Sequence, residues 1–227
     1  MPMKLEGSCR CNRVRFTVES NCPYPYMKCY CDICRKCQGG GGFAINIHAL
    51  KATLKVEGDE YINTWSTISH PPDDSGDASA TDRRSCRVCA SCLWCYCKEN
   101  EECIYPFASC IDTPLPKSPE IYHILLKYKP DWVELPVKEW KDKQVFIDQS
   151  GVKHIFFKGY PDEGIWEWHD KRRLLVDDPD TDRKDGKEVE EGDYEPVVID
   201  HEVDGDADVE KVKEEQYDEP AKKRQKK

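Results

Sequence analysis

The stretch Cys29-Tyr30-Cys31-Asp32-Ile33-Cys34 places three thiols within six residues of the chain. A second set of cysteines is split into two short pairs, one near the N-terminus and one much further along: Cys9 and Cys11, then Cys86 and Cys89. Spacings of C-x-C and C-x-x-C hold thiols close enough to share one metal ion. The two sets use seven of the fourteen cysteines, so we expect the fold to be built around them.

Thiolate sulfur at short fixed spacing favours zinc over calcium or magnesium. Four thiols complete a tetrahedron around zinc, whereas three leave one coordination position free for a reacting group. This inequality between the two sets is the main clue to function, because a structural metal has no use for an empty position. The sequence therefore predicts two zinc ions per chain, with an iron–sulfur cluster as the competing interpretation.

The remaining cysteines leave two alternatives open. Cys92, Cys95 and Cys97 fall on one predicted strand, where buried thiols acting as small hydrophobic side chains are favoured over a third zinc. Cys37 follows the three-cysteine set and could serve as a fourth ligand or a resolving thiol. The favoured interpretation is that it does neither. The histidines at 48, 123, 154 and 169 have no ligand spacing to the cysteines, so we expect them to serve in packing or on the surface.

The composition points to a reducing compartment. The first residues, Met1–Gly7, contain no apolar run of signal-peptide length, and no apolar stretch is long enough to span a bilayer. We therefore expect a cytoplasmic protein without a membrane partner, in which thiols persist and bind metal. The alternative, a secreted scaffold of disulfides, fits the C-x-C and C-x-x-C spacings less well.

Charge divides the 227-residue chain unevenly, with 34 basic and 44 acidic residues overall. The residues up to Val176 are neutral, so the net charge of −10 comes from Asp177–Lys227. That segment has few aromatic residues, and we predict that it is disordered. It ends in a basic cluster, Pro220–Lys227, which could act as a nuclear import signal, but the acidic excess before it argues against nucleic-acid binding.

The neutral part of the chain reads as short strands separated by turns. Arg13–Val18 alternates polar and apolar residues, as expected for a half-buried strand. Leu54–Glu57 and Tyr61–Trp65 resemble a hairpin around Gly58-Asp59. Ser69–Thr81 is rich in Pro, Asp, Ser and Gly, which predicts a flexible loop. We expect a two-zinc domain over 1–140, an aromatic-rich extension packed on it over 141–176, and the disordered acidic tail over 177–227.

Several motifs together resemble one known family. They are Gly7-Ser8-Cys9-x-Cys11, Val14-Arg15-Phe16, Cys29-x-Cys31-x-x-Cys34-Arg35, Arg84-x-Cys86-x-x-Cys89, Ala108-Ser109-x-x-Asp112 and Pro119-x-x-x-His123. In this order the motifs are similar to those of the glutathione-dependent formaldehyde-activating enzyme and centromere protein V family, and the likeness covers about Lys4 to Leu135.

The resemblance implies a mainly β, Mss4-like fold of short antiparallel sheets with two zincs. By this likeness Cys9, Cys11, Cys86 and Cys89 hold the structural zinc, and Cys29, Cys31 and Cys34 hold the catalytic one. Glycines of the family pattern are replaced here by Asn12, Ala90 and Ser109. Because Ala poorly tolerates a left-handed backbone, we expect a displaced turn near Cys89. Asp32, where a small polar residue is common, adds a negative charge beside the thiols.

The resemblance also implies an activity. A thiol that occupies the open position of the three-cysteine zinc would have a lowered pKa and could capture a small aldehyde. The expected function is that of a carbon–sulfur lyase that forms or cleaves S-hydroxymethyl adducts of glutathione and formaldehyde. The alternative is a non-catalytic zinc-binding module with a nuclear or interaction role.

Overall fold

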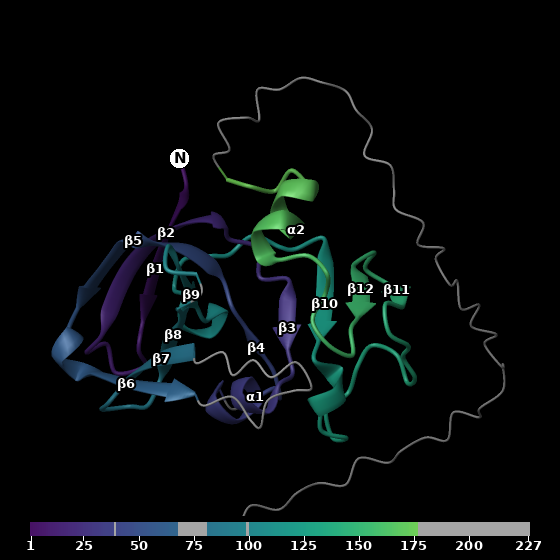
Figure 1. The fold of residues 1–227 in the computed structure, drawn as a ribbon, viewed down its shortest axis with the longest axis horizontal. Helices are drawn as coiled ribbons and strands as arrows, with labels where there is room; N and C mark the ends of the chain where they lie inside the picture. Colours follow the sequence, from purple (N-terminus) through teal and green to yellow (C-terminus); the bar gives the residue numbers. More distant parts are fainter. Residues whose placement is uncertain (39, 68–80, 99, 177–227) are drawn as a thin grey trace, which may run out of the picture. The chain divides into compact units, whose positions relative to one another are not determined.

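The computed structural model describes residues 1–38, 40–67, 81–98 and 100–176, which all lie in the unit Met1–Val197 (Figure 1). The flexible loop expected over Ser69–Thr81 lies outside the described residues except for Thr81, and so does the tail expected to be disordered from Asp177 onward. Within the described residues, no helix has both the length and the apolar character needed to span a bilayer.

Most regular structure in the described residues is β, which confirms the predicted fold class. The strands, in chain order, are β1 (Met3–Ser8), β2 (Arg15–Cys22), β3 (Met27–Cys29), β4 (Ala44–Ile45), β5 (His48–Glu57), β6 (Ile62–Thr67), β7 (Thr81–Cys86), β8 (Cys92–Cys97), β9 (Cys103–Pro106), β10 (Glu120–Ile124), β11 (Val145–Ile147) and β12 (Lys153–Phe156). The helices are short: α1 (Asp32–Gln38), α2 (Ile165–Lys171) and the single 3-10 turns η1 (Asp59–Tyr61), η2 (Ala108–Cys110) and η3 (Leu126–Tyr128).

Seven strands form an antiparallel sheet in the order β1-β2-β5-β9-β8-β7-β6. The alternation predicted near Arg13–Val18 becomes β2, in which Phe16 and Val18 are buried. Phe16 meets Trp94 of β8 edge to face, with ring centroids 5.1 Å apart. Since β2 and β8 are not neighbours in the sheet, this contact shows that the sheet curls around a shared core.

The predicted hairpin around Gly58-Asp59 is wrong. Strand β5 pairs with β2 and β9, whereas β6 pairs with β7 through a register that sets Ile62 opposite Cys86. Gly58 has φ 77°, and a Cβ there would collide with the carbonyl oxygen of Arg13. The turn therefore packs against the β1–β2 connection and continues into η1. After η1 the chain forms β6, which pairs with β7 and not with β5.

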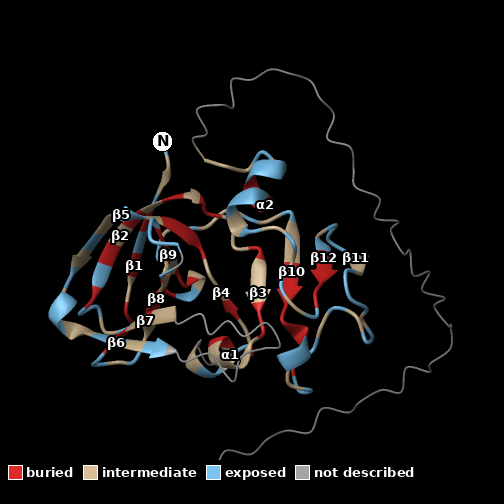
Figure 2. Cartoon of the chain, viewed as in Figure 1, coloured by how far each residue is buried: buried red, intermediate tan, exposed pale blue. Residues whose placement is uncertain are grey.

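The second sheet has the order β11-β12-β10-β3-β4 and is mixed, because β10 runs parallel to both β3 and β12. Most residues of β10 and β12 are buried, as Figure 2 shows. The C-terminal strands are joined to β3 through β10. The position of Cys29 at the end of β3 is thus supported by backbone pairing with Ile124 of β10.

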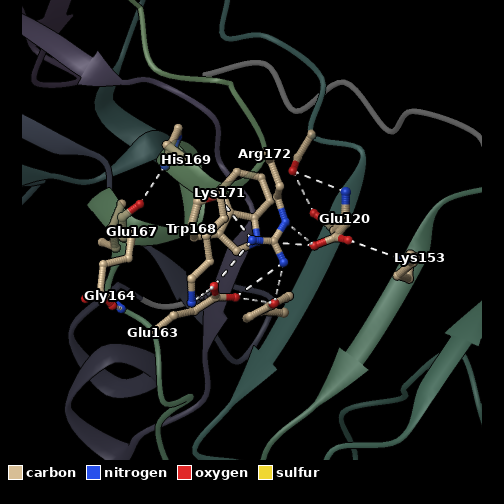
Figure 3. Close-up of polar contacts among 12 residues, drawn as sticks. Glu120, Lys153, Glu163, Gly164, Glu167, Trp168, His169, Lys171 and Arg172 are labelled. Atoms are coloured by element: carbon tan, nitrogen blue, oxygen red, sulfur yellow. Dashed lines mark hydrogen bonds and ion pairs between the residues drawn. The ribbon is translucent and has the colours of Figure 1, made fainter. Parts of the chain in front are cut away.

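Helix α2 is held on the second sheet by one stacked pair of rings and one charged network. Trp168 is fully buried and stacks on Tyr26 with centroids 3.8 Å apart and planes 8° apart. The Arg172 guanidinium donates to Glu120 at 2.7 Å and to the Tyr122 hydroxyl at 2.9 Å (Figure 3). Because Tyr26 directly precedes β3, these contacts connect α2 to the strand that carries Cys29.

Truncation of Trp168 should therefore be costly. We expect Trp168→Ala to lower the free energy of unfolding by about 3–5 kcal/mol, the usual cost of removing a buried large aromatic ring. Trp166→Ala is the matched control on the same helix, because Trp166 is 49% exposed, and its change should stay within about 1 kcal/mol. Denaturant unfolding measures both, and equal losses would show that α2 is not anchored through Trp168.

Candidate metal centre

The two cysteine pairs that are far apart in sequence meet in space. Cys9 and Cys11 follow β1, while Cys86 ends β7 and Cys89 lies between β7 and β8. Their four sulfurs lie within 4.8 Å of one another, and Cys11 Sγ is 3.5 Å from Cys9 Sγ and 3.7 Å from Cys86 Sγ. Sulfurs bound at about 2.3 Å to one tetrahedral zinc stand roughly 3.8 Å apart. This four-cysteine group therefore fits a closed metal site.

The two turns of the four-cysteine group each contain a left-handed residue that is not glycine. Asn12 N donates to Cys9 O and Ala90 N donates to Cys86 O, each at 2.8 Å. Asn12 has φ 56° and Ala90 has φ 59°, so both residues are left-handed. The displaced turn expected near Cys89 is not found. Instead Ala90 takes the strained conformation that a glycine would take without cost.

Relief of this strain can be measured. Ala90→Gly should raise the free energy of unfolding by up to about 1 kcal/mol, because a left-handed L residue costs roughly 1–2 kcal/mol and the freedom of glycine in the unfolded chain offsets part of the gain. Asn12→Gly is the control, since Asn tolerates this conformation, and it should bring no such gain. Denaturant unfolding of both variants, loaded with metal, measures these changes in the free energy of unfolding. Equal changes in the two variants would contradict the strain at Ala90.

Hydrogen bonds at Cys9 and Cys89 favour the ionised form that a metal requires. Burial opposes ionisation at Cys9, but the backbone amide of Val14 donates to its sulfur at 3.3 Å and lowers its pKa. Burial also opposes ionisation at Cys89, yet hydrogen bonds from Ser91, whose Oγ lies 3.2 Å from the sulfur, help to lower the pKa to about 6. At Cys11 a hydrogen bond from the Arg13 backbone lowers the pKa, but burial and the neighbouring sulfurs raise it to about 11 overall, so metal binding would displace the proton of this thiol.

The other predicted set also assembles. Cys29 ends β3, Cys31 directly precedes α1, and Cys34 lies in its first turn. Their three sulfurs lie within 4.8 Å of one another, and the Cys34 amide donates to Cys31 Sγ at 3.3 Å. Cys37 lies one turn further along α1 and is not among the sulfurs of this three-cysteine group. Three thiols at this spacing fit a metal with one position left open.

A buried cation faces the three-cysteine group. Arg83 Nη2 donates to Cys34 Sγ at 3.6 Å. Hydrogen bonds from Cys29 and Cys31, together with the positive charge of Arg83, lower the pKa of Cys34 well below its usual value. The neighbouring sulfurs raise the pKa of Cys29. At Cys31 the hydrogen bond with Cys29 lowers the pKa, but Cys34 and burial raise it overall, because further negative charges at the same place are disfavoured. A divalent cation would remove that penalty.

The two groups differ in access to ligands. A cleft of about 680 Å³ is lined by all three residues of the three-cysteine group and by none of the four-cysteine group. Its lining also includes Asn46, Arg83, Tyr128 and Tyr160. A volume in this range suits a small-molecule site. The open coordination position expected from the sequence therefore coincides with the group that faces a cleft.

The other cysteines predicted to lie in the core behave differently from the two groups. All fourteen cysteines are free thiols, and among the described residues the four-cysteine and three-cysteine groups are the only ones with metal-like geometry that contain cysteine. Cys95 is buried, and burial raises its pKa to about 12. The Cys92 thiol donates to the backbone oxygen of Cys37 at 3.2 Å. These contacts are those of packed thiols, and they favour that alternative over a third zinc.

Sequence reasoning missed a hydrogen-bonded chain behind the three-cysteine group. The Tyr30 hydroxyl lies 2.9 Å from His123 Nδ1, His123 Nε2 lies 3.0 Å from His154 Nδ1, and His154 Nε2 lies 3.2 Å from Asp148. Hydrogen bonds from Ser150 and the Val152 amide hold the pKa of Asp148 below its usual value. The Asp148 carboxylate can only accept, so His154 Nε2 donates to it. His154 Nδ1 then accepts from His123 Nε2, and His123 Nδ1 accepts from the Tyr30 hydroxyl.

This chain joins β3, β10 and β12 through side chains behind the cysteines. Tyr30, between Cys29 and Cys31, and His123 are each 2% exposed. No local spacing predicts it, because two of its members lie in β10 and β12, the other two follow β3 and β11, and they meet only through the parallel pairing of β10. The prediction that His123 and His154 serve in packing is compatible with their burial, but it did not foresee that they contact each other.

The burial of His123 predicts sensitivity to acid. Burial, with Lys28 and His154 nearby, lowers its pKa from 6.5 to about 3. Its folded-state pKa is depressed, so the unfolded chain binds more protons below pH 6.5, and stability should fall as the pH drops from there toward 3. We expect His123→Gln to reduce this fall by up to about 1.4 kcal/mol per pH unit. Denaturant unfolding of both proteins between pH 7 and pH 5 checks this, and parallel pH dependences would contradict it.

Comparison with known proteins agrees with this architecture. The family model described as "Glutathione-dependent formaldehyde-activating enzyme" matches residues 4–127. A protein of Halomonas elongata that carries the name of this enzyme is 44% identical over 167 residues, which are 74% of this chain and 95% of the relative. The chain belongs to the glutathione-dependent formaldehyde-activating enzyme family.

A crystal structure of a Rhodobacter sphaeroides protein is also similar in part. It is 22% identical, with a TM-score of 0.38, and the match covers 50% of this chain and 92% of that chain.

Proposed function

We propose that this protein is a zinc-dependent enzyme that joins the thiol of glutathione to formaldehyde, or cleaves the resulting S-hydroxymethyl adduct, as a carbon–sulfur lyase does. The observation that carries the proposal is the unequal access of the two cysteine groups. The three-cysteine group lines a cleft of about 680 Å³, whereas no member of the four-cysteine group lines it. Membership of the family and the name of the Halomonas elongata relative supply glutathione and formaldehyde as substrates.

The ligands proposed for the structural zinc are Cys9, Cys11, Cys86 and Cys89, and those for the catalytic zinc are Cys29, Cys31 and Cys34. Zinc in the open site would lower the pKa of an incoming thiol and supply one position for its sulfur. The protein orients the three sulfurs through β3 and the first turn of α1, and all three residues line the cleft. The histidine chain behind Tyr30 fixes the backbone between Cys29 and Cys31.

The walls of the cleft suit a zwitterionic substrate such as glutathione. Cationic side chains, Arg83 and Lys127, and acidic ones, Asp32, Asp162 and Glu163, all line it. Glu163 is already paired with Arg172, whose Nη2 lies 3.3 Å from Oε1, and Asp162 is paired with Lys143 at 2.8 Å. Arg83 is paired with the Cys34 sulfur, whereas Lys127 has no ion pair with another described residue, which supports binding of a substrate carboxylate by Lys127.

The alternative function is a non-catalytic zinc module with a nuclear or interaction role. The feature that favours it is the basic cluster Pro220–Lys227, which lies outside the described residues. In that alternative Cys37 would complete the second tetrahedron and no thiol could enter. The two alternatives therefore differ in one testable property, the number of protein ligands around the second zinc.

A pair of variants on either side of α1's first turn tests the proposal. Cys31→Ser should bind about one zinc in place of two and should lose the acceleration of adduct formation from glutathione and formaldehyde, with secondary structure retained. Cys37→Ser, one turn beyond the group, should keep both zincs and the activity. Metal analysis and the rate of formaldehyde consumption are the measurements. Loss of the second zinc in Cys37→Ser would make the site a closed one and support the binding module.

A further inference from the structure

Arg83 carries a buried guanidinium in the lining of the cleft that holds the three-cysteine group. It lies on β7, is 5% exposed and lines the cleft. Its guanidinium carbon lies 5.4 Å from the ring centroid of Phe107 and 6.0 Å from that of Trp65. Two aromatic faces and strand β7 therefore fix the direction of this charge.

The hydrogen bonds of this guanidinium are incomplete. Nη2 donates to Cys34 Sγ at 3.6 Å, but Nε and Nη1 have no partner among the described residues. The side-chain oxygen of Asn46, which also lines the cleft, is buried and likewise has no partner in that part of the chain. Unpaired donors of a buried cation are costly. The lining of one cleft therefore contains unpaired donors and an unpaired acceptor, which indicates a polar ligand group that both donates and accepts.

We propose that Arg83 is a catalytic residue that donates hydrogen bonds to the oxygen of the aldehyde, and that Asn46 accepts from the hydroxyl of the adduct. This inference rests on the proposed function. The guanidinium contacts a sulfur of the three-cysteine group itself, so its free donors act close to where the substrate thiol must lie. The aldehyde oxygen is two bonds from the reacting sulfur in the adduct, whereas the carboxylates of glutathione are separated from that sulfur by many more.

The step balances without an oxidant or reductant. The thiolate sulfur forms a bond to the aldehyde carbon, and the π pair of the C=O bond moves to oxygen. Arg83 stabilises the negative charge that develops there, through hydrogen bonds that strengthen as the charge grows. The proton that the thiol released to water on ionisation is matched by one that the oxygen takes from water, and the product carries a hydroxyl group. The reverse reaction uses the same contacts.

Arg83→Gln tests the inference, with Arg84→Gln as its control. Arg84 is the next residue of β7, so its side chain points to the opposite face of the strand, and it does not line the cleft. We expect Arg83→Gln to keep both zincs and to bind glutathione, without aldehyde, within threefold of wild type by calorimetry. Its kcat/KM for adduct formation should fall by about 10²-fold, as for loss of an oxyanion donor, while Arg84→Gln should stay near wild type.

The choice of thiol shows whether Arg83 binds the aldehyde oxygen or a carboxylate oxygen of glutathione. With 2-mercaptoethanol, which has no carboxylate, Arg83→Gln should lose the same factor as with glutathione. A loss confined to glutathione, together with weaker glutathione binding, would overturn the inference and assign Arg83 to a carboxylate. An unchanged kcat/KM with both thiols would also overturn it. A wild-type protein that gives no acceleration with either thiol would refute the proposed function itself, and the inference with it.

If Arg83→Gln does not fold, Arg83→Lys gives the same answer. Lysine keeps the charge but lacks the planar set of donors, so we expect kcat/KM to fall at least tenfold with both thiols while glutathione affinity is kept. Wild-type kcat/KM in Arg83→Lys would overturn the inference, because charge alone would then suffice.

Discussion

The contact on which the fold depends is the meeting of four sulfurs from opposite parts of the seven-stranded sheet. Cys9 and Cys11 follow β1, an edge strand, whereas Cys86 ends β7 and Cys89 lies between β7 and β8, toward the other edge. The sheet must curl for these sulfurs to come within 4.8 Å. The Arg10 amide, which donates to Ser91 Oγ at 3.1 Å, joins the same two turns.

The contribution of a metal in the four-cysteine group to the stability of the fold can be judged from two free energies. A structural zinc bound by thiolates contributes roughly 10–16 kcal/mol in small zinc-binding peptides. The net stability of a folded domain is only about 5–15 kcal/mol. A metal in the four-cysteine group would therefore be worth as much as the whole margin of stability. The strain at Ala90 is small by comparison, which explains how the turn can keep a residue that disfavours its own backbone conformation.

The three-cysteine group has a different support. Its residues belong to β3 and α1, and β3 is held by β10, which in turn is held by β12 and by α2 through Trp168 and Arg172. The C-terminal strands and helix therefore stabilise the group from behind and leave its front facing the cleft. The four-cysteine group joins the two ends of one sheet, and the three-cysteine group lies at the end of a strand in the other.

Much of the candidate site could be predicted from the sequence, because metal-binding cysteines have short and regular spacing. The two groups follow from this spacing, and the β class follows from short stretches of alternating polar and apolar residues separated by turns. The hairpin at Gly58 was wrong since local turn residues do not reveal that both edges of β5 are already taken by β2 and β9. Arg83 and the chain from Tyr30 to Asp148 depend on contacts between distant strands, and no spacing along the sequence indicates them.

The central claim is that the two cysteine groups hold metal with unequal numbers of protein sulfurs. X-ray absorption of the zinc-loaded protein at the zinc edge tests it most directly. We predict an average of about 3.5 sulfurs per zinc, because one site has four protein sulfurs and the other has three. This average should rise to about 4 when glutathione is added. An average of about 4 without glutathione, unchanged by its addition, would mean that both sites are closed and would contradict the account.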